Sequence, residues 1–556
     1  MQRLAYEKVV NQLIHENPRF AIDEVDINGT STKVWRSAFE SLRVVLERSY
    51  QYGNATYLVY ENERISYEQH YQLVCSLAHT LVSDFDVQPG DRVALAMRNL
   101  PEWPVIFWAT VSIGAIIVPL NAWWETTELA YAIKDSAPKV LFVDAQRWQK
   151  LSSILSELTS TQLVVTRSDE IHTPPLQYES LINNHFDKTA LPARSLHPDH
   201  AATLFYTSGT TGLPKGALGT HRNICNNLIS SAFHKTVAQI RRGDTAQPTP
   251  ATGHLLSVPL FHATGCHAML CGNTLSGNKL VFMYKWNAEE AIRLIESERL
   301  SSFGGVPSMV WQVIESPEFK SHDLSTVNQI MYGGAPAAPE LAKRIHKLFP
   351  QVQSSNGYGL TETSALATSN QAEDYLETPD SVGKPAPVTQ VKVVDELGQQ
   401  VPTGEIGELW IKGPNVILGY WNNPEATTES FTQGWLHTGD LARMDDEGRI
   451  YIMDRAKDMI IRGGENVYCV EVENVLYSHP EIMDAAVIGI PDKILGEEVG
   501  AIVQLIPNSQ LTETEIIQYT EGKLAPFKRP VRVNITRAPL PRNANGKILK
   551  KQLKMN

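Results

Sequence analysis

Cysteine is scarce in this sequence, with five residues among 556, and no two of them form a Cys-x-x-Cys pair. An odd number of thiols without that spacing argues against a disulfide framework and against a zinc ribbon. A chain of this length buries enough apolar surface to be stable without such cross-links. We therefore expect reduced, buried cysteines in a cytoplasmic protein.

Positive charge is also in deficit. Lys and Arg number 49 and Asp and Glu number 61, which leaves a formal net charge of −12. An acidic chain is a poor candidate for broad binding to nucleic acid, although it can still bind a nucleotide locally. Hydrophobic residues make up 42% and charged residues 20% of the sequence, a mixture typical of folded domains rather than of disordered chains.

No hydrophobic run has the length of a membrane span. The most apolar stretch, 105–120, is shorter than the roughly 20 residues that a spanning helix needs, and Ser112, Gly114 and Pro119 interrupt it. We predict a buried helix followed by a buried strand there. Residues 1–16 carry charges early and lack an apolar core, so we expect no signal peptide. A weak peripheral contact with membranes and a homodimeric state are both left open.

The first half of the chain alternates strand-like segments with helix-like ones. Strands are predicted at 93–97, 116–118, 140–143, 202–206 and 254–258, and helices at 128–134, 222–233 and 288–298 and from a start at 99–102. Such alternation favours an α/β architecture with largely parallel sheets.

The pattern changes twice in the second half. From about residue 381, short strands at 391–394, 407–411 and 449–452 are separated by Gly, Pro and Asp turns, which favours an antiparallel sheet or a small barrel. Beyond residue 455 we expect a helix at 470–479, a strand at 485–489 and a helix at 512–524. Thr512 and Glu515 have capping-box spacing at the start of that last helix.

One loop carries the strongest chemical signal. Residues 206–216 read Tyr-Thr-Ser-Gly-Thr-Thr-Gly-Leu-Pro-Lys-Gly, between a predicted strand and a predicted helix. Such a loop can bring backbone N–H groups and hydroxyls close to phosphate oxygens, because glycine has no Cβ and tolerates positive φ. It is not a Walker A loop, since Lys215 is followed by Gly216 and not by Ser or Thr.

This loop resembles the signature phosphate loop of the adenylate-forming superfamily, which includes acyl-CoA synthetases, peptide-synthetase adenylation domains and firefly luciferase. Segments similar to the superfamily's other motifs occur in this sequence in the same order, at 258–265, 332–336, 356–362, 434–440, 454–457 and 541–547. The resemblance covers nearly the whole chain from about residue 40.

The resemblance implies both a fold and a domain organisation. The fold is α/β, with a large N-terminal domain at 1–454 that contains two α/β sheets and a small β-barrel. A hinge at 455–457 then leads to a small, mobile α+β domain at 458–556.

Activation of a carboxylate by ATP brings two anions together, so the site must supply cations and fixed donors. The resemblance implies ATP, Mg²⁺ and coenzyme A as cofactor and co-substrates. Glu362 is the expected Mg²⁺ ligand, because Mg²⁺ prefers a carboxylate together with phosphate oxygens, and Thr361 is expected at the α-phosphate. The expected phosphate-binding residues are Thr207, Ser208, Gly209, Thr210, Thr211, Gly212 and Lys215.

The rest of the nucleotide is assigned in the same way. Tyr358 is expected to stack on adenine and Asn356 to bond its edge. Asp440 is expected to accept both ribose hydroxyls, and Arg455 to donate to the same sugar. The other nucleotide-site residues that the resemblance implies are Gly333, Gly334, Ala335, Pro336, Gly357 and Gly359.

His262 lies in the motif that borders the acyl carboxylate in the superfamily. No Asp or Glu lies between His254 and Tyr284, which disfavours an amino-acid substrate. No Arg lies there either, and Lys279 is the only cation before Lys285, which disfavours a dicarboxylate. The neighbours expected around the acyl group are apolar or aromatic, namely Val258, Leu260, Met269, Leu270, Val306, Met309 and Trp311. We therefore expect a medium- or long-chain fatty acid or an aryl acid.

The last domain holds residues for two half-reactions. Lys547 resembles the lysine that reaches the α-phosphate and the carboxylate during adenylation. Gly463, Gly464 and Asn466 belong to a segment that resembles the lining of the coenzyme A tunnel in the second step. Because both sets cannot occupy one site together, the small domain is expected to rotate about Lys457.

The sequence thus predicts an enzyme that makes acyl-AMP and then acyl-CoA, with Lys547, Glu362, Thr361 and His262 as its catalytic residues. Two alternatives stay open. One is a ligase that delivers the acyl group to a carrier-protein thiol, although no carrier domain is appended. The other is an inactive nucleotide-binding regulator.

Overall fold

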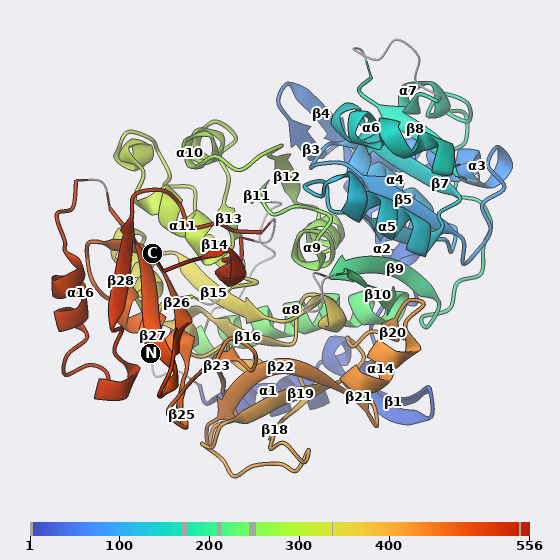
Figure 1. The fold of residues 1–556 in the computed structure, drawn as a ribbon. Coiled ribbons are helices and arrows are strands. Elements are labelled where there is room, and N and C mark those ends of the chain that lie inside the picture. Colours follow the sequence, from blue (N-terminus) through green and yellow to red (C-terminus); the bar gives the residue numbers. More distant parts are fainter. Residues whose placement is uncertain are drawn as a thin grey trace.

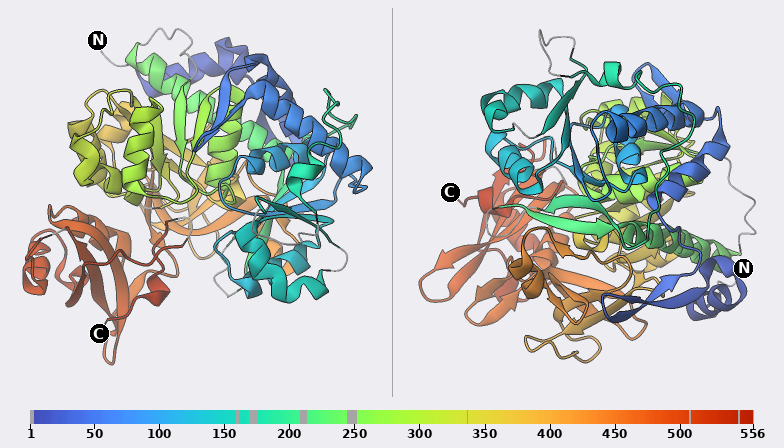
Figure 2. Two further views of the ribbon diagram at one scale, coloured as in Figure 1. Left: turned by 90° about the horizontal axis from the view of Figure 1, so that it is seen from above. Right: turned by 90° about the vertical axis from the view of Figure 1, so that its right-hand side faces the viewer.

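The structure, a computed structural model, describes residues 4–158, 161–168, 176–207, 213–243, 252–335, 337–506, 508–543 and 546–555. Within those residues the strands form two large sheets, a two-stranded hairpin and two smaller sheets (Figure 1). The C-terminal sheet stands at one corner of the molecule, beside the rest of the chain (Figure 2).

The first large sheet has seven strands in the order β20-β10-β9-β6-β5-β7-β8. Strands β5 to β9 pair in parallel, as the alternation of strands and helices predicts. The strands are β5 (Arg92–Ala96), β6 (Ile116–Pro119), β7 (Val140–Asp144), β8 (Gln162–Thr166), β9 (Ala201–Thr207), β10 (Lys215–Thr220) and β20 (Gly419–Tyr420).

The apolar stretch at 105–120 forms a buried helix and a buried strand, as predicted. Helix α4 (Glu102–Ser112) precedes β6, and Trp103, Phe107 and Trp108 on it are fully buried. None of the described helices is both long enough and apolar enough to cross a membrane. All five cysteines are free and buried, in agreement with the sequence analysis.

The second large sheet has nine strands in the order β17-β16-β15-β14-β13-β11-β12-β3-β4. Its strands are β3 (Thr56–Tyr60), β4 (Glu63–Ser66), β11 (Gly253–Leu256), β12 (Lys279–Phe282), β13 (Ser302–Gly305), β14 (Gln329–Gly333), β15 (Gln353–Tyr358), β16 (Thr368–Gln371) and β17 (Lys384–Pro385). Helices α10 (Ala288–Ser297), α11 (Pro307–Ile314) and α12 (Pro339–Leu348) bury apolar side chains in the core of this sheet.

The remaining helices surround the two large sheets. Helix α8 begins at a capping box formed by Thr220 and Asn223 and ends at Arg242, and its C-cap residue is Gly243, whose φ is +78°. The α-helices are α1 (Tyr6–Glu16), α2 (Leu42–Ser49), α3 (Tyr67–Ser83), α5 (Thr126–Ser136), α6 (Ala145–Leu151), α7 (Tyr178–Leu181), α8 (His221–Arg242), α9 (Gly272–Ser276), α13 (Ala372–Glu377) and α14 (Pro424–Ser430). Shorter helical turns are η1 (Pro18–Phe20), η2 (Tyr50–Tyr52), η3 (Ser152–Glu157), η5 (Pro317–Lys320), η6 (Thr361–Thr363), η7 (Pro526–Lys528) and η8 (Lys550–Gln552).

A five-stranded antiparallel sheet follows, where the sequence predicts an antiparallel sheet or a small barrel. Its strands are β18 (Gln390–Val394), β19 (Gly407–Lys412), β21 (Phe431–Thr432), β22 (Trp435–Met444) and β23 (Ile450–Arg455). The separate hairpin near the N-terminal end consists of β1 (Ile22–Ile27) and β2 (Thr30–Trp35).

The C-terminal part has its own sheet and its own core. Its elements are β24 (Ile460–Arg462), β25 (Glu465–Val467), α15 (Cys469–Tyr477), β26 (Ile482–Asp492), β27 (Gly496–Leu505), α16 (Glu513–Tyr519) and β28 (Arg532–Thr536). Strand β23 belongs to the preceding sheet and β24 to this one, so the chain changes sheets across residues 456–459. The predicted fold class, α/β with a large N-terminal and a small C-terminal part, is confirmed.

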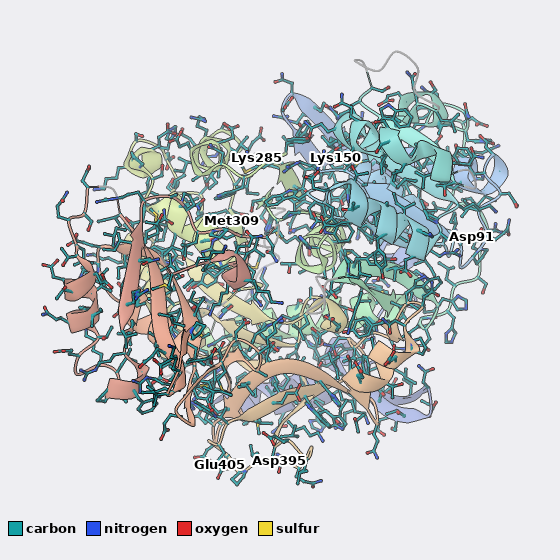
Figure 3. The ribbon with its side chains drawn as sticks, in the orientation of Figure 1. Asp91, Lys150, Lys285, Met309, Asp395 and Glu405 are labelled. Carbon is teal, nitrogen blue, oxygen red and sulfur yellow. The ribbon has the colours of Figure 1, made fainter. Side chains whose placement is uncertain are left out.

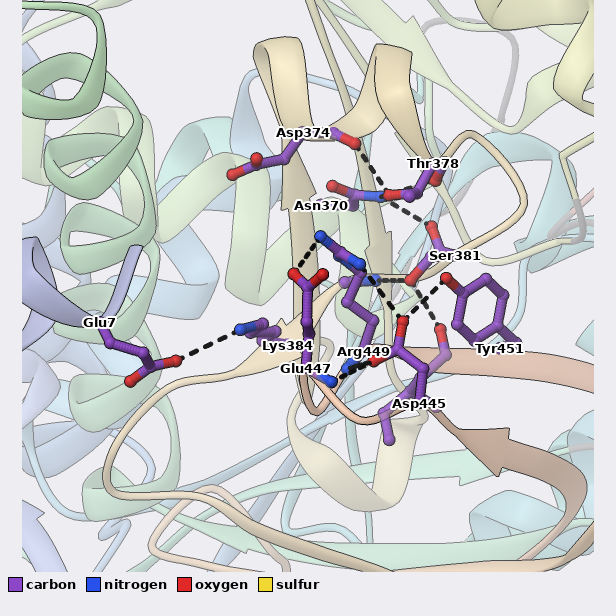
Figure 4. Close-up of polar contacts among 12 residues, drawn as sticks. Glu7, Asn370, Asp374, Thr378, Ser381, Lys384, Asp445, Glu447, Arg449 and Tyr451 are labelled. Carbon is purple, nitrogen blue, oxygen red and sulfur yellow. Dashed lines mark hydrogen bonds and ion pairs between the residues drawn. The ribbon is translucent and has the colours of Figure 1, made fainter. Parts of the chain in front are cut away.

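A polar network fixes the turn between β22 and β23 (Figure 4). The carboxylate of Asp445 accepts hydrogen bonds from the hydroxyl of Tyr451 at 3.0 Å and from the backbone N–H of Arg449 at 2.8 Å. The hydroxyl of Ser381 donates to the carbonyl oxygen of Ile450 at 2.9 Å. The network therefore holds this hairpin against the segment that leads into β17, where Gly383 pairs with Ile450.

Two sequence predictions need correction. The loop at 206–216 does not lead directly into a helix, because β10 follows it and pairs antiparallel with β9. The strand contains Gly216 and Gly219, and because glycine has a low β-propensity, the sequence does not predict a strand there. A Cβ on either glycine would lie within 2.8 Å of a side chain of β9. The helix predicted at 512–524 begins at the expected capping box but ends at Tyr519.

Candidate active site

A cavity of about 230 Å³ lies between the N-terminal sheets and the C-terminal part. Its wall combines the ends of β14 and β15, the β22–β23 pair, and residues of the C-terminal part near 470–484 and 542–550. The predicted site residues that line it are Gly334, Ala335, Asn356, Gly357, Tyr358, Gly359, Asp440, Arg455 and Lys547. Segments more than 200 residues apart thus share one cavity, which we call the nucleotide cavity.

Two polar contacts in the nucleotide cavity join Tyr358, Asp440 and Arg455. Asp440 on β22 lies opposite Arg455 on β23, and the Nε atom of Arg455 is 2.9 Å from Oδ1 of Asp440. The hydroxyl of Tyr358, at the end of β15, donates to Oδ2 of Asp440 at 2.7 Å. Burial and the charge of Asp440 raise the pKa of Tyr358, so this hydroxyl stays a donor.

The backbone near Gly333 and Gly357 is closely packed. These two residues face each other in the parallel pair β14–β15. A Cβ on Gly333 would lie 2.4 Å from the carbonyl oxygen of Gly357. Gly334 follows with φ of +75°, a conformation that favours glycine. The close approach leaves Asn356 and Tyr358 at one edge of the cavity, and Pro336 lies outside the described residues.

Glu362 has a partner that the sequence analysis missed. The hydroxyl of Tyr420 on β20 donates to Oε1 of Glu362 at 2.8 Å, and the Nζ atom of Lys215 lies 5.3 Å from the centre of the Tyr420 ring. Burial and the charge of Glu362 raise the pKa of Tyr420. Only the pairing of β20 with β10 brings Tyr420 next to Lys215, and no local sequence pattern signals that pairing.

The phosphate loop is described only at its two ends. Thr207 ends β9 and Lys215 begins β10, and the hydroxyl of Thr207 donates to the carbonyl oxygen of Lys215 at 3.3 Å. The predicted residues Ser208, Gly209, Thr210, Thr211 and Gly212 lie outside the described residues.

No group of three or more His, Cys, Asp or Glu side chains in the described part of the chain is arranged to hold a metal ion. A magnesium ion at Glu362 would therefore take its other ligands from phosphate oxygens and water, which suits a metal that binds together with its nucleotide. Thr361 opens the same short turn, η6, and Glu362 follows it directly.

His262 lies immediately before an unpredicted π-helix, η4 (Thr264–Cys271). Its Nε2 atom is buried and has no hydrogen-bond partner among the described residues. Burial lowers the pKa of His262 to about 3, so its imidazole is neutral at pH 7. Its ring centre lies 4.7 Å from that of Phe261.

Lys547 reaches the nucleotide cavity from a tightly folded loop. The backbone N–H of Lys547 donates to Oδ1 of Asn543 at 3.0 Å, and the N–H of Asn543 donates back to the carbonyl oxygen of Lys547 at 2.9 Å. Gly546 has φ of +72°, and a Cβ there would lie 2.4 Å from Cγ2 of Val306. Burial, and then the charge of Arg455, lower the pKa of Lys547 to about 8.

The residues predicted to line the coenzyme A tunnel lie away from the nucleotide cavity. Gly463 and Gly464 form the turn between β24 and β25, and Asn466 lies on β25. The N–H of Gly463 donates to the carbonyl oxygen of Leu495 at 2.8 Å. Neither these residues nor Lys457 line the nucleotide cavity. The described structure thus places Lys547 at the cavity and keeps the glycine turn away from it.

A second cavity of about 150 Å³, the side chamber, adjoins the first, since Ser308, Gln312 and Arg542 line both. Of the apolar residues predicted around the acyl group, Val306 and Met309 line the side chamber and Trp311 lines the nucleotide cavity. Val258, Leu260 and Leu270 instead are buried in the core.

Family models match most of the chain. One described as AMP-binding enzyme matches residues 45–421, and one described as AMP-binding enzyme C-terminal domain matches residues 471–547.

Individual proteins match over similar lengths. The chain is 32% identical over 502 residues to a feruloyl-CoA synthase of an Amycolatopsis species, covering 90% of this chain and 96% of that protein. It is 34% identical over 491 residues to the long-chain-fatty-acid–CoA ligase FadD13 of Mycobacterium tuberculosis, covering 88% and 93%. A solved structure of the anthranilate CoA ligase AuaEII with anthranoyl-AMP superposes with a TM-score of 0.82, at 26% identity, over 93% of this chain and 96% of that one.

Proposed function

The chain belongs to the AMP-binding enzyme family of adenylate-forming acid–thiol ligases, and on that premise we propose its substrate class and its acceptor. The proposed substrate is a carboxylic acid with an apolar tail, either a medium- or long-chain fatty acid or an aryl acid. The proposed acceptor is coenzyme A, so that the products are acyl-CoA, AMP and pyrophosphate. Ligases of this family use ATP, Mg²⁺ and coenzyme A.

One observation carries this proposal. Lys547, Arg455 and Asp440 line a single cavity together with Tyr358, although they come from three different sheets or loops. A cation of lowered pKa beside a paired Asp and Arg suits the binding of a nucleotide whose α-phosphate reacts. The aromatic ring of Tyr358, on the same wall of the cavity, offers a flat surface on which adenine can stack.

The proposed first step is attack by a carboxylate oxygen on the α-phosphate. A new bond forms between that oxygen and phosphorus, and pyrophosphate leaves with the electron pair of the broken bond. Negative charge crowds between the acid and the phosphate, and the ammonium of Lys547 offsets it. In the proposed second step a thiol sulfur attacks the acyl carbon, and AMP leaves.

The magnesium ion would be held by Glu362 together with phosphate oxygens, and it would neutralise charge on the leaving pyrophosphate. Tyr420 orients the carboxylate of Glu362 through its 2.8 Å hydrogen bond. Thr207 and Lys215 stand at the two ends of the phosphate loop, where they would contact the same phosphates.

We also propose the division of the chain into 1–454, a hinge at 455–457 and 458–556. The change of sheet between β23 and β24 supports this division. The position of the Gly463–Gly464 turn, away from the cavity that holds Lys547, supports a rotation of the small domain between the two steps.

The test is a screen of carboxylic acids, from acetate to palmitate and including cinnamates, with release of AMP as the readout. Turnover with fatty or aryl acids and free coenzyme A is the expected result. If AMP forms only when a carrier protein is added, the acceptor is a carrier thiol. Strong turnover with a free amino acid would contradict the substrate class.

A further inference from the structure

The side chamber has an unbalanced charge. Among the described residues that line it are three cations, Arg98, Lys285 and Arg542, and no Asp or Glu (Figure 3, in which Lys285 is labelled). Arg542 is compensated, because it pairs with Asp484 and donates to the carbonyl oxygen of Gly546. The excess positive charge of the chamber therefore rests on Arg98 and Lys285.

The topology explains why these residues meet. Arg98 follows the end of β5 and Trp123 follows the end of β6, both in the seven-stranded sheet. Tyr284 and Lys285 follow the end of β12, in the nine-stranded sheet. The carboxyl ends of parallel strands from both sheets thus open on the chamber, and this edge is where α/β sheets bind ligands.

Arg98 lies between two aromatic rings, and its buried Nε atom has no acceptor among the described residues. Its guanidinium lies 5.4 Å from the ring centre of Trp123 and 5.3 Å from that of Tyr284. Its Nε atom is buried and has no hydrogen-bond partner among the described residues. The carboxylate of Asp144 accepts from the backbone N–H of Arg98 at 3.3 Å, but its ion pair is with Arg147, at 2.7 Å.

A guanidinium stays protonated at neutral pH, so Arg98 keeps its charge. A buried donor without a partner is unfavourable unless a ligand supplies the acceptor. Burial and the charge of Arg147 lower the pKa of Arg98, as expected for a half-buried cation that forms no ion pair with any described residue.

Lys285 supplies the second charge of the chamber. Its side chain is exposed, and it forms no ion pair with any residue in the described part of the chain. Trp123 is 43% exposed and offers a flat apolar surface beside these cations. A fixed guanidinium, a mobile ammonium and an indole face together suit an anion carried on an apolar or aromatic body.

We propose that the side chamber binds a carboxylate or phosphate group carried on an apolar or aromatic body, with Arg98 and Lys285 as its cationic partners. The proposal rests on the proposed function, because such a group can come from two sources in that reaction. One is an acid whose apolar tail ends in a second carboxylate, which extends the proposed substrate class, and the other is the nucleotide end of coenzyme A. Arg98 lies outside the interval 254–284, so the absence of Arg from that interval does not exclude the first of them.

The experiment compares Arg98→Gln and Lys285→Gln with the wild type and with Lys33→Gln, which removes an exposed cation on β2. One arm measures acyl-AMP formation without coenzyme A from matched acids, hexadecanoate against hexadecanedioate and cinnamate against 4-carboxycinnamate. The other arm supplies acyl-AMP and compares coenzyme A with pantetheine, which lacks the nucleotide. Calorimetric binding of coenzyme A, pantetheine and both diacids repeats the comparison without turnover.

The expected result is a rise of about tenfold in KM or Kd for the member of one pair that carries the additional carboxylate or the phosphates, while the member that lacks this group and the variant Lys33→Gln stay unchanged. A selective rise in KM or Kd in the first arm identifies the acid as the source of the anion, and a selective rise in the second arm identifies coenzyme A. Arg98→Lys keeps the charge and is expected to show a smaller rise than Arg98→Gln. Lys285 is exposed, so Lys285→Gln gives a reading even if Arg98→Gln fails to fold.

Equal changes for the ligands with and without the additional anionic group, or no change for either, would overturn the proposal. A wild-type protein that forms no acyl-AMP from any acid counts instead against the proposed function, and the binding comparison then still decides the role of the chamber. The two ideas therefore fail in distinguishable ways.

Discussion

The carboxylate of Asp440 joins two sheets at the nucleotide cavity. Its Oδ1 atom is 2.9 Å from Nε of Arg455, its partner across β22–β23, while its Oδ2 atom accepts a 2.7 Å hydrogen bond from Tyr358 at the end of β15. Asp440 is only 3% exposed, so water does not screen these contacts strongly. The position of the carboxylate is therefore set by both sheets at once.

Asp440→Asn is expected to raise the KM for ATP by about tenfold or more. The amide keeps a hydrogen-bonding group near Tyr358 but loses the charge that balances Arg455 and that, in the proposed site, would accept from the sugar. Steady-state kinetics of AMP release measure the effect. Asp446→Asn, at the exposed turn of the same hairpin, is the matched control and should leave the KM unchanged; a similar rise in both variants would contradict the assignment.

Lys547→Ala is expected to slow adenylation by about 10²–10³, which corresponds to roughly 3–4 kcal/mol of transition-state stabilisation. Conversion of supplied acyl-AMP and coenzyme A should stay close to the wild-type rate, because in the proposed mechanism the lysine acts only in the first step. Single-turnover rates of the two half-reactions check this, with Lys554→Ala as a nearby control. Equal loss in both steps by a folded variant would refute the role.

Adenylation is expected to decline as pH rises through about 8. Burial lowers the pKa of Lys547 to about 8, from an ordinary value near 10.4, so the ammonium that the step needs is lost early in the alkaline range. The pH profile of kcat/KM for ATP reports the free enzyme and measures this limb directly. In Lys547→Arg the limb should move to higher pH, since a guanidinium stays charged. A limb at the same pH in that variant would assign it to another group.

Lys457→Pro is expected to leave acyl-AMP formation nearly normal and to slow transfer to coenzyme A strongly. Proline restricts φ and removes a backbone N–H, so the proposed hinge would be confined to one orientation. Stopped-flow or quench measurements of each half-reaction test this, with Lys457→Ala as the control for loss of the side chain. If the proline slows both half-reactions to the same extent, the rotating-domain proposal is not supported.

Tyr420→Phe is expected to raise the Mg²⁺ concentration needed for half-maximal activity several-fold. The variant keeps the ring under Lys215 but removes the hydroxyl that donates to Glu362, so the carboxylate loses its fixed orientation. Titration of Mg²⁺ at fixed ATP measures the shift, and calorimetric binding of MgATP gives a readout apart from activity. Tyr50→Phe, at an exposed tyrosine, serves as the control. An unchanged Mg²⁺ requirement would leave Tyr420 with a packing role only.

Local patterns in the sequence were sufficient for much of the fold. Each predicted strand overlaps an observed one, and the capping box at Thr512 and Glu515 forms as expected. These features depend on neighbouring residues, whose periodicity and side-chain chemistry act over a few positions. Glycine-rich β10 was missed, because its strand conformation comes from pairing with β9 rather than from propensity.

The sequence by itself determined the family, because the motifs and their order along the chain are recognisable without knowing which residues are in contact. It also marked Asp440, Arg455, Tyr358 and Lys547, which the structure brings to one cavity. Only the tertiary structure decided that Tyr420 donates to Glu362 and that Arg98 and Lys285 share a chamber. Those contacts join strand ends that are distant in the chain. Their energy depends on the order of strands in the sheets and on burial, and neither can be predicted from a local sequence pattern.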